Sequence, residues 1–230
     1  MYFMHSDAIW NAHPNLYALA VVAGNVLGMK NDPKRLERLT PAIEKRLASN
    51  AESEMPEIAA WREAFSKMGL KPTQTRCASE ALLRRYRKEK SMPSLHPLVD
   101  YLNYVSMVFA IPIAAYDCEK IYNGITVRPA DGSEIYVTFQ GEIEHPAPNE
   151  TIFADREGNA HSRRWTHRQS AKSVVTPKTD RVLIVAEALH ATARRDILSL
   201  EQDLQAGLTE AGIHIAGSKK LSPTERRFEF

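Results

Sequence analysis

The alternation of apolar and polar positions predicts that the first third of the chain is mainly helical, after one buried strand. That strand is the apolar run at residues 16–24, which ends in a glycine. Asp32 followed by Pro33 is typical of a helix start, and apolar residues then recur at helical spacing up to Leu47. We expect Pro41 to divide this stretch into two helices, because proline removes a helix hydrogen bond. Further helices are predicted from Pro56 to Gly69 and from about Ser79 onward.

The middle of the chain carries the period-two pattern of strands. Residues 125–128 and 134–139 lie on either side of a Pro-Ala-Asp-Gly turn, so we expect them to pair as a hairpin. Further strands are predicted at 151–155 and 181–188, and a last helix carries its apolar residues on one face and ends at Gly212. Because helices and strands cluster instead of alternating strictly, the sequence predicts an α+β fold with a mixed β-sheet core flanked by helices.

Residues 96–117 form an unusual stretch with no charged side chain between Asp100 and Asp117. Crossing a bilayer needs about 20 apolar residues, and this stretch is too short and too interrupted for that. We expect a buried helix that leads through Pro112 into a strand. Its polar residues, Asn103 among them, are expected to face a cavity.

Composition is ordinary for a globular protein. The chain has 230 residues, of which 43% are apolar and 25% charged, and its net charge is +2. Attraction to nucleic acid must therefore come from a local patch. The N-terminus lacks the features of a secretory signal, Cys77 and Cys118 are isolated, and the histidines show no ligand spacing. We expect a reduced, cytoplasmic protein without a metal or cofactor, and the oligomeric state stays open.

One local basic patch is present at the end of the helix that begins near Ser79. Cations at a helix C-terminus are stabilised by the helix dipole, so one interpretation is a solvated helix end. The other is a phosphate-binding surface for tRNA. The basic residues concerned are Arg84, Arg85, Arg87, Lys88 and Lys90.

Several short motifs occur in an order that resembles a known family. They are Val99-Asp100, Asn103-Tyr104-Val105, Pro112, Tyr116-Asp117, VRPADGSE at 127–134, ETIFAD at 150–155 and Thr179. In this order they resemble the B3/B4 domain of the β subunit of bacterial phenylalanyl-tRNA synthetase, over roughly residues 70–190. Gly69-Leu70-Lys71-Pro72 and an Arg-Trp…Arg-Gln-Ser segment are closer still to stand-alone proteins built from this domain.

The resemblance implies a B3/B4-like fold and a proofreading activity. In the synthetase this domain binds the 3′ end of a charged tRNA and hydrolyses the ester when the wrong amino acid is attached. A free-standing copy is then expected to deacylate mischarged aminoacyl-tRNA in trans, or to be a non-catalytic module that senses the charged end or a free amino acid. We expect an extension at 1–68 packed on the core, the B3/B4-like domain at 69–212, and a flexible tail at 213–230. Nothing resembles an aminoacylation domain.

Three departures from the family indicate that the pocket has been rebuilt. Ala114 stands where the synthetase has a histidine, and the first carboxylate of the late strand, Glu187, lies beyond the family's position. RRWTHRQS at 163–170 replaces a glycine-rich turn. We expect this segment and Asn103 to form opposite walls of one cavity, with Glu187 near its floor.

The candidate site residues follow from these positions. His167 is the side chain suited to act as a general base near neutral pH. Asn103 can orient a substrate or cap backbone groups, Asp117 can hold an amine or cap the following turn, and the carboxylate at 187 can face a pocket or water. The segment at 163–170 can equally be a surface hairpin. The expected catalytic residues are Asn103, His167, Arg168, Gln169, Ser170 and Glu187, and the expected pocket residues are Ala114, Tyr116, Asp117 and Trp165.

Overall fold

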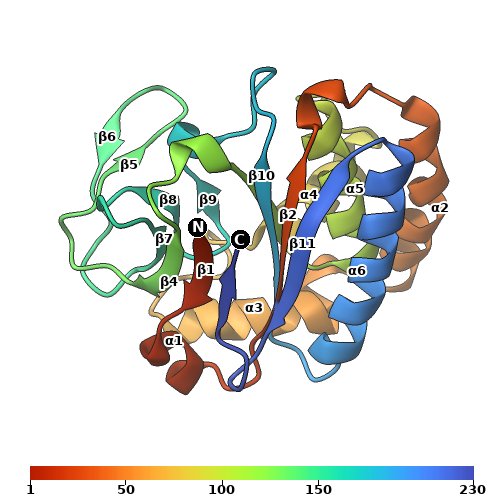
Figure 1. Cartoon of the computed structure of the whole chain (residues 1–230). Coiled ribbons are helices and arrows are strands. Elements are labelled where there is room, and N and C mark those ends of the chain that lie inside the picture. Colours follow the sequence, from red (N-terminus) through yellow and green to blue (C-terminus); the bar gives the residue numbers. More distant parts are fainter.

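Two β-sheets form the frame of the protein in the computed structural model, which describes residues 1–230 (Figure 1). The six-stranded sheet has the order β12-β1-β4-β7-β8-β9, and the four-stranded sheet has the order β11-β2-β10-β3. The pair β1–β4 is parallel and the other pairs are antiparallel, so the six-stranded sheet is mixed. The strands are β1 (Tyr2–His5), β2 (Tyr17–Gly24), β3 (Ile113–Asp117), β4 (Ile125–Pro129), β7 (Thr151–Ala154), β8 (Ala160–Arg163), β9 (Arg168–Gln169), β10 (Val182–Ala188), β11 (His214–Leu221) and β12 (Arg227–Glu229), and β5 (Tyr136–Val137) pairs with β6 (Ile143–Glu144).

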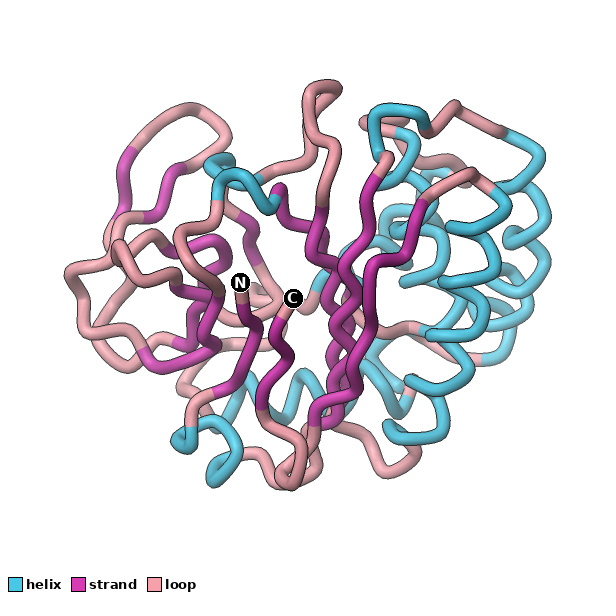
Figure 2. The backbone as a smooth tube through the Cα atoms, in the orientation of Figure 1, coloured by secondary structure: helices cyan, strands magenta, loops and turns pink.

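Helices cover the outer face of the four-stranded sheet and one end of the space between the sheets (Figures 1 and 2). They are α1 (Asp7–Ala12), α2 (Pro33–Ser49), α3 (Pro56–Lys67), α4 (Ala78–Glu89), α5 (Pro97–Phe109) and α6 (Ala193–Glu210). The predicted α+β class is confirmed, as are the helix and strand on either side of Pro112. None of the helices combines the length and apolar character that a bilayer span requires.

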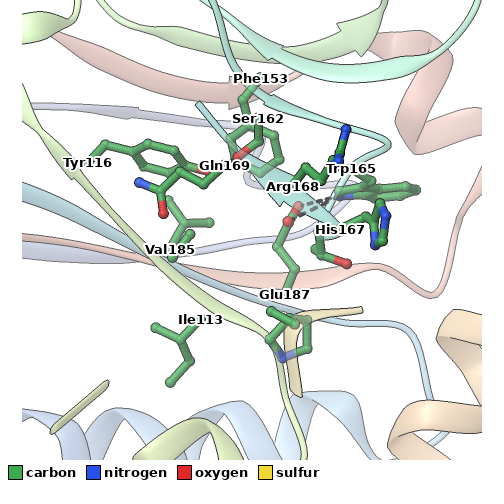
Figure 3. Close-up of a pocket in the computed structure, with 14 residues that line it drawn as sticks. Ile113, Tyr116, Phe153, Ser162, Trp165, His167, Arg168, Gln169, Val185 and Glu187 are labelled. Atoms are coloured by element: carbon green, nitrogen blue, oxygen red, sulfur yellow. Dashed lines mark hydrogen bonds between the residues drawn. The ribbon is translucent and has the colours of Figure 1, made fainter. Parts of the chain in front are cut away.

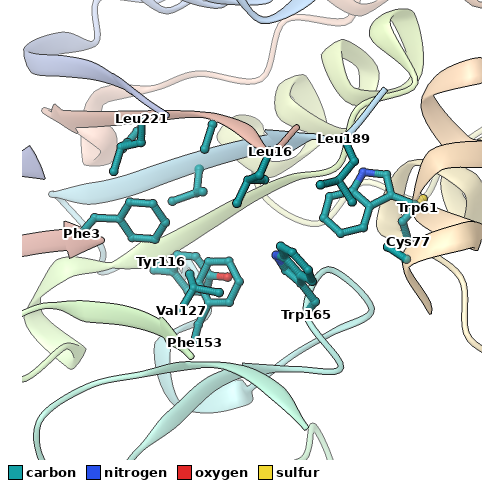
Figure 4. Close-up of a cluster of buried hydrophobic side chains, with 14 of the residues drawn as sticks. Phe3, Leu16, Trp61, Cys77, Tyr116, Val127, Phe153, Trp165, Leu189 and Leu221 are labelled. Carbon is teal, nitrogen blue, oxygen red and sulfur yellow. The ribbon is translucent and has the colours of Figure 1, made fainter. Parts of the chain in front are cut away.

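The central strands are apolar on both faces because both faces are buried. Alternate residues of β2 such as Ala20 and Val22 face a core between the two sheets, where Figure 4 shows Phe3, Phe153 and Trp165. Their neighbours, such as Val21, face a second core beneath α5 and α6. The same alternation along β10 turns Leu183 and Val185 into the space between the sheets.

Helix α2 continues through Pro41, so the prediction of two helices is wrong. Pro41 is exposed, and the carbonyl of Glu37 that loses its helix partner lies on the same solvent-facing side. Ile43 and Leu47 on the other side are buried in the hydrophobic core, where α2 packs against α5. An internal proline costs about 3 kcal/mol or more, and this packing offsets that cost.

The expected hairpin between 125–128 and 134–139 is also wrong. β4 pairs with β1 and β7, whereas β5 pairs with β6. The carboxylate of Glu134 accepts hydrogen bonds from the backbone N–H groups of Asp131 and Gly132 and pairs with Arg128. These bonds hold the connecting loop in a shape that leads the chain away from β4.

The two ends of the chain are integral parts of the sheets. Residues 213–230 were expected to be flexible, but they form β11 and β12, which pair with β2 and β1. Within the first 68 residues, β1 and β2 are internal strands of the two sheets, so this segment is more than an extension packed on a finished core. The termini meet, since the N–H of Phe230 donates to the carbonyl of Met1 at 2.9 Å.

Candidate functional site

A small cavity opens between the two sheets, beside β3, β10 and the loop that joins β8 to β9 (Figure 3). Its volume is about 80 Å³. We call it the Glu187 cavity, because that carboxylate is among its lining residues. Hydrophobic side chains, including Tyr116, Phe153 and Val185, make up half of the lining, and the polar side chains come from Ser162, Glu187 and residues 166–169.

Glu187 is buried, with only 2% of its surface exposed, because it follows Leu183 and Val185 in the alternation of β10. The carboxylate accepts from His5 Nε2 at 2.6 Å and from Trp165 Nε1, which is 3.1 Å from each of its oxygens. Figure 3 shows the bonds to Trp165 as dashed lines. Glu187 is therefore not at a solvated strand end, and its side chain lines the cavity.

Trp165 reaches Glu187 through an unusual backbone turn. Arg164 and Trp165 both have positive φ angles, of 49° and 56°, which non-glycine residues rarely adopt. The indole is fully buried and makes edge contacts with Trp61 and His13, at centroid distances of 4.9 and 4.8 Å. Left-handed non-glycine residues cost about 1–3 kcal/mol each and persist where packing determines them. The strain thus places an N–H donor on the buried carboxylate.

His167 is held in one tautomer. Its Nδ1 lies 2.8 Å from the carbonyl of Arg76, and since a carbonyl only accepts, Nδ1 carries the proton. The lone pair on Nε2 is therefore free. Burial lowers the pKa of His167, the carbonyl of Arg76 opposes that shift, and neighbouring arginines such as Arg168 lower the pKa further. At neutral pH this cavity residue is uncharged and able to accept a proton.

The three predicted residues after His167 point in different directions. Arg168 lines the cavity with about half of its side chain exposed, and its nearest carboxylate, Glu144, is 3.8 Å away. Gln169 donates from Nε2 to the carbonyl of Ala115 at 2.7 Å. The Ser170 hydroxyl is buried outside the cavity and bonds the backbone of Val137, so a catalytic role for Ser170 is not supported by its position.

Asn103 lies in a second cavity, so the expected single cavity with opposite walls is wrong. This Asn103 cavity has a volume of about 280 Å³ and a mainly apolar lining. It shares Ile113, Ala114 and Gln169 with the Glu187 cavity. β3 and Gln169 therefore separate two adjacent chambers, and the small side chain of Ala114 borders both.

Of the remaining predicted pocket residues, Tyr116 lines a cavity and Asp117 does not. Tyr116 lines the Glu187 cavity, and its hydroxyl lies 2.8 Å from that of Ser162. Burial raises the pKa of Tyr116, which keeps the phenol neutral. Asp117 accepts from the N–H of Glu119 at 3.0 Å and from the Thr179 hydroxyl at 2.7 Å, and it lines neither cavity. Of its two interpretations, capping is the one that the structure supports.

The basic end of α4 contains both paired and unpaired cations. Arg87 donates to Glu52 at 2.6 Å, and Arg85 donates to Glu89 at 2.9 Å. Arg84, Lys88 and Lys90 are exposed and have no carboxylate partner within 4 Å. Because Ala78 at the other end of α4 lines the Glu187 cavity, the basic patch begins half a helix length from that cavity and extends away from it.

One cluster has the residue types of a metal site. Ligand atoms of Glu57, His190 and Asp196 lie within 4.8 Å of one another. Arg46 pairs with Glu57 at 2.9 Å and Arg195 with Asp196 at 2.8 Å, so two cations already neutralise the carboxylates. His190 Nε2 lies 2.8 Å from Asp196. The arrangement fits an ion-pair network at the start of α6, and no chemistry is assigned to it.

His5 is the site residue that sequence reasoning missed. It is fully buried in β1, far from the motifs in the chain, and its contact with Glu187 spans 182 positions. A single polar residue in the apolar segment YFMH is the signal that could have indicated it. Its other nitrogen, Nδ1, is buried and has no hydrogen-bond partner.

Comparison with known proteins identifies the class of domain to which this fold belongs. The model of the B3/4 domain family matches residues 60–204. The chain belongs to this family, so the resemblance to the B3/B4 domain is confirmed.

A solved structure with the same fold is an N-terminal fragment of the phenylalanyl-tRNA synthetase beta-subunit from Pyrococcus horikoshii. It is similar at a TM-score of 0.52 and 11% sequence identity. The alignment covers 95% of this chain and 53% of that one, so this chain spans about half the length of the fragment. No curated protein matches the sequence.

Proposed function

We propose that this protein binds the 3′ end of tRNA and hydrolyses, in trans, the ester of mischarged aminoacyl-tRNA. One observation carries the proposal. The Glu187 cavity combines a buried carboxylate with an uncharged imidazole whose Nε2 is free. Membership of the B3/4 domain family and the shared fold with a tRNA synthetase subunit add support.

Glu187 is the group proposed to hold the free α-amino group of the substrate. A carboxylate is the natural partner of an ammonium ion, and burial among apolar side chains strengthens that attraction. The cavity of about 80 Å³ is roughly half of an engineered cavity of about 150 Å³ that binds benzene. It therefore favours amino acids with small side chains.

His167 is the proposed general base. Its Nε2 takes a proton from a water molecule, whose oxygen attacks the ester carbonyl carbon. The carbonyl oxygen becomes an oxyanion, which Arg168 at the cavity stabilises. When the carbon–oxygen bond to the ribose breaks, the imidazolium returns its proton to the ribose oxygen. The products are the free amino acid and tRNA with a free hydroxyl.

A water nucleophile is consistent with the state of the two cysteines of the chain. Burial raises the pKa of Cys77 to about 11 and that of Cys118 to about 12, so neither thiol supplies a thiolate near neutral pH. The ester is already activated, and a positioned water with a base and oxyanion donors is sufficient for its hydrolysis.

The test is a deacylation screen over tRNAs charged with different amino acids. We expect faster release of a small, wrongly attached amino acid than in buffer. His167→Gln should abolish the acceleration, and His214→Gln, which alters an exposed histidine on β11, should not. Tight tRNA binding without release of any amino acid supports the alternative, a non-catalytic module that senses the charged end or a free amino acid.

A further inference from the structure

The Asn103 cavity differs in character from the Glu187 cavity. Its lining is mostly apolar, from residues such as Leu102 and Val175. Leu95 and Phe139 line it while remaining 70% and 65% exposed. Phe139 lies in the turn between β5 and β6, and its ring contacts no other aromatic ring of the protein. An open aromatic face beside an apolar cavity is suited to stacking against a planar ring.

Two carboxamides give this apolar cavity a polar side. The side chain of Asn103 has no hydrogen-bond partner in the protein and is half-buried in the cavity. Gln169 uses one N–H on the carbonyl of Ala115, which leaves its second N–H and its oxygen free. Asn and Gln side chains pair with adenine through a donor and an acceptor together.

The edge of β3 adds backbone groups to the same wall. β3 pairs with β10 on one side only. The carbonyl of Ala115 points away from β10, because it accepts the hydrogen bond from Gln169. In an antiparallel pair every second residue has its backbone groups on the same side, so those of Ile113 also point away from β10. An unpaired strand edge presents N–H and C=O groups that a ligand can satisfy.

The wall that the two cavities share determines how an aminoacyl nucleoside could occupy both of them. Ile113, Ala114 and Gln169 border both cavities, and in Figure 3 Gln169 and Ile113 lie on the opposite side of Glu187 from Trp165 and His167. In an aminoacyl ester of a nucleoside, the amino acid and the base extend from opposite sides of the ribose. An amino acid in the Glu187 cavity therefore places the base toward the Asn103 cavity.

We propose that the Asn103 cavity binds the adenine of the terminal adenosine of the RNA, stacked on Phe139 and hydrogen-bonded by Asn103 and Gln169. This inference rests on the proposed function for the choice of RNA. Its volume of about 280 Å³, against about 80 Å³ for the Glu187 cavity, assigns the larger group to the larger chamber.

The experiment measures equilibrium binding of two RNA hairpins with a single-stranded CCA end, one intact and one with the terminal base removed. Loss of a stacked base weakens single-strand binding by about 1–3 kcal/mol, so we expect wild-type protein to bind the abasic RNA about tenfold more weakly. Phe139→Ala should remove this difference. Ile143→Ala, equally exposed at 65% but outside the cavity, should keep it.

Equal affinity of wild-type protein for the two RNAs overturns the inference, and so does failure to bind either RNA. It is also overturned if free phenylalanine, and not adenosine monophosphate, competes with the intact RNA, because the cavity is then an amino-acid pocket. The assay involves no turnover. A protein that passes it but releases no amino acid contradicts the proposed deacylase activity and leaves adenine binding supported.

Discussion

The carboxylate oxygen Oε1 of Glu187 lies 2.6 Å from Nε2 of His5 inside the protein, and the two side chains are 2% and 0% exposed. The pair joins the central strand β10 to the first strand of the chain, which lies outside the residues matched by the B3/4 domain family. The cavity carboxylate thus contacts a segment outside the residues that the family model matches.

Glu187→Ala should destabilise the fold strongly, because it leaves His5 and the indole N–H of Trp165 buried without their acceptor. Breaking a buried pair typically costs about 3–5 kcal/mol. Glu187→Gln keeps an acceptor oxygen and should cost less, while raising KM for aminoacyl-tRNA. Urea unfolding of both variants measures the difference. Equal stability of Glu187→Ala and wild type contradicts the role given to the pair.

The deacylation rate should depend on pH through His167. Because the folded pKa of His167 lies below its ordinary value, the reactive neutral form predominates at pH 7. The rate should stay level above pH 6.5 and fall as the pH drops through the folded pKa. General bases typically contribute about 10²–10⁴ in rate, and His167→Gln should lose that factor. Single-turnover rates from pH 5 to 8 test this. If the rate of His167→Gln still falls at low pH as the wild-type rate does, another residue is the general base.

Arg168→Lys should slow deacylation by about 10²–10³, the usual effect of losing one oxyanion donor, because lysine does not reproduce the planar guanidinium. Bulk tRNA affinity should change little. Arg164→Lys is the matched control, since Arg164 lies four residues earlier in the same segment and lines neither cavity. Wild-type rates in Arg168→Lys would show that this guanidinium does not take part in the reaction.

The unpaired cations at the end of α4 should contact RNA phosphates. Each such contact contributes about one unit to the slope of log K against log salt. Arg84→Ala combined with Lys88→Ala should therefore reduce that slope by about two. Arg38→Ala, which removes an exposed arginine on α2, serves as the control. An unchanged slope in the double variant identifies the patch as a solvated helix end.

The sequence by itself determined those features that depend on neighbouring residues. The cap at Asp32 and the proline after it start α2, and the continuous apolar runs of β2 and β10 indicate strands buried on both faces. The alternation of β10 also placed Glu187 on the same face as Val185. Family resemblance directed attention to the segment that contains Trp165 and His167.

Only the tertiary structure decided which distant elements meet. Local patterns specify the faces and ends of an element but not its partner, so the pairing of β4 with β1 and the joining of the termini were not predictable. The same holds for the contact of Glu187 with His5 and for the division of the site into two cavities. Packing across the whole chain selects these contacts, and it also carries α2 through Pro41, because the buried face of that helix outweighs one lost hydrogen bond.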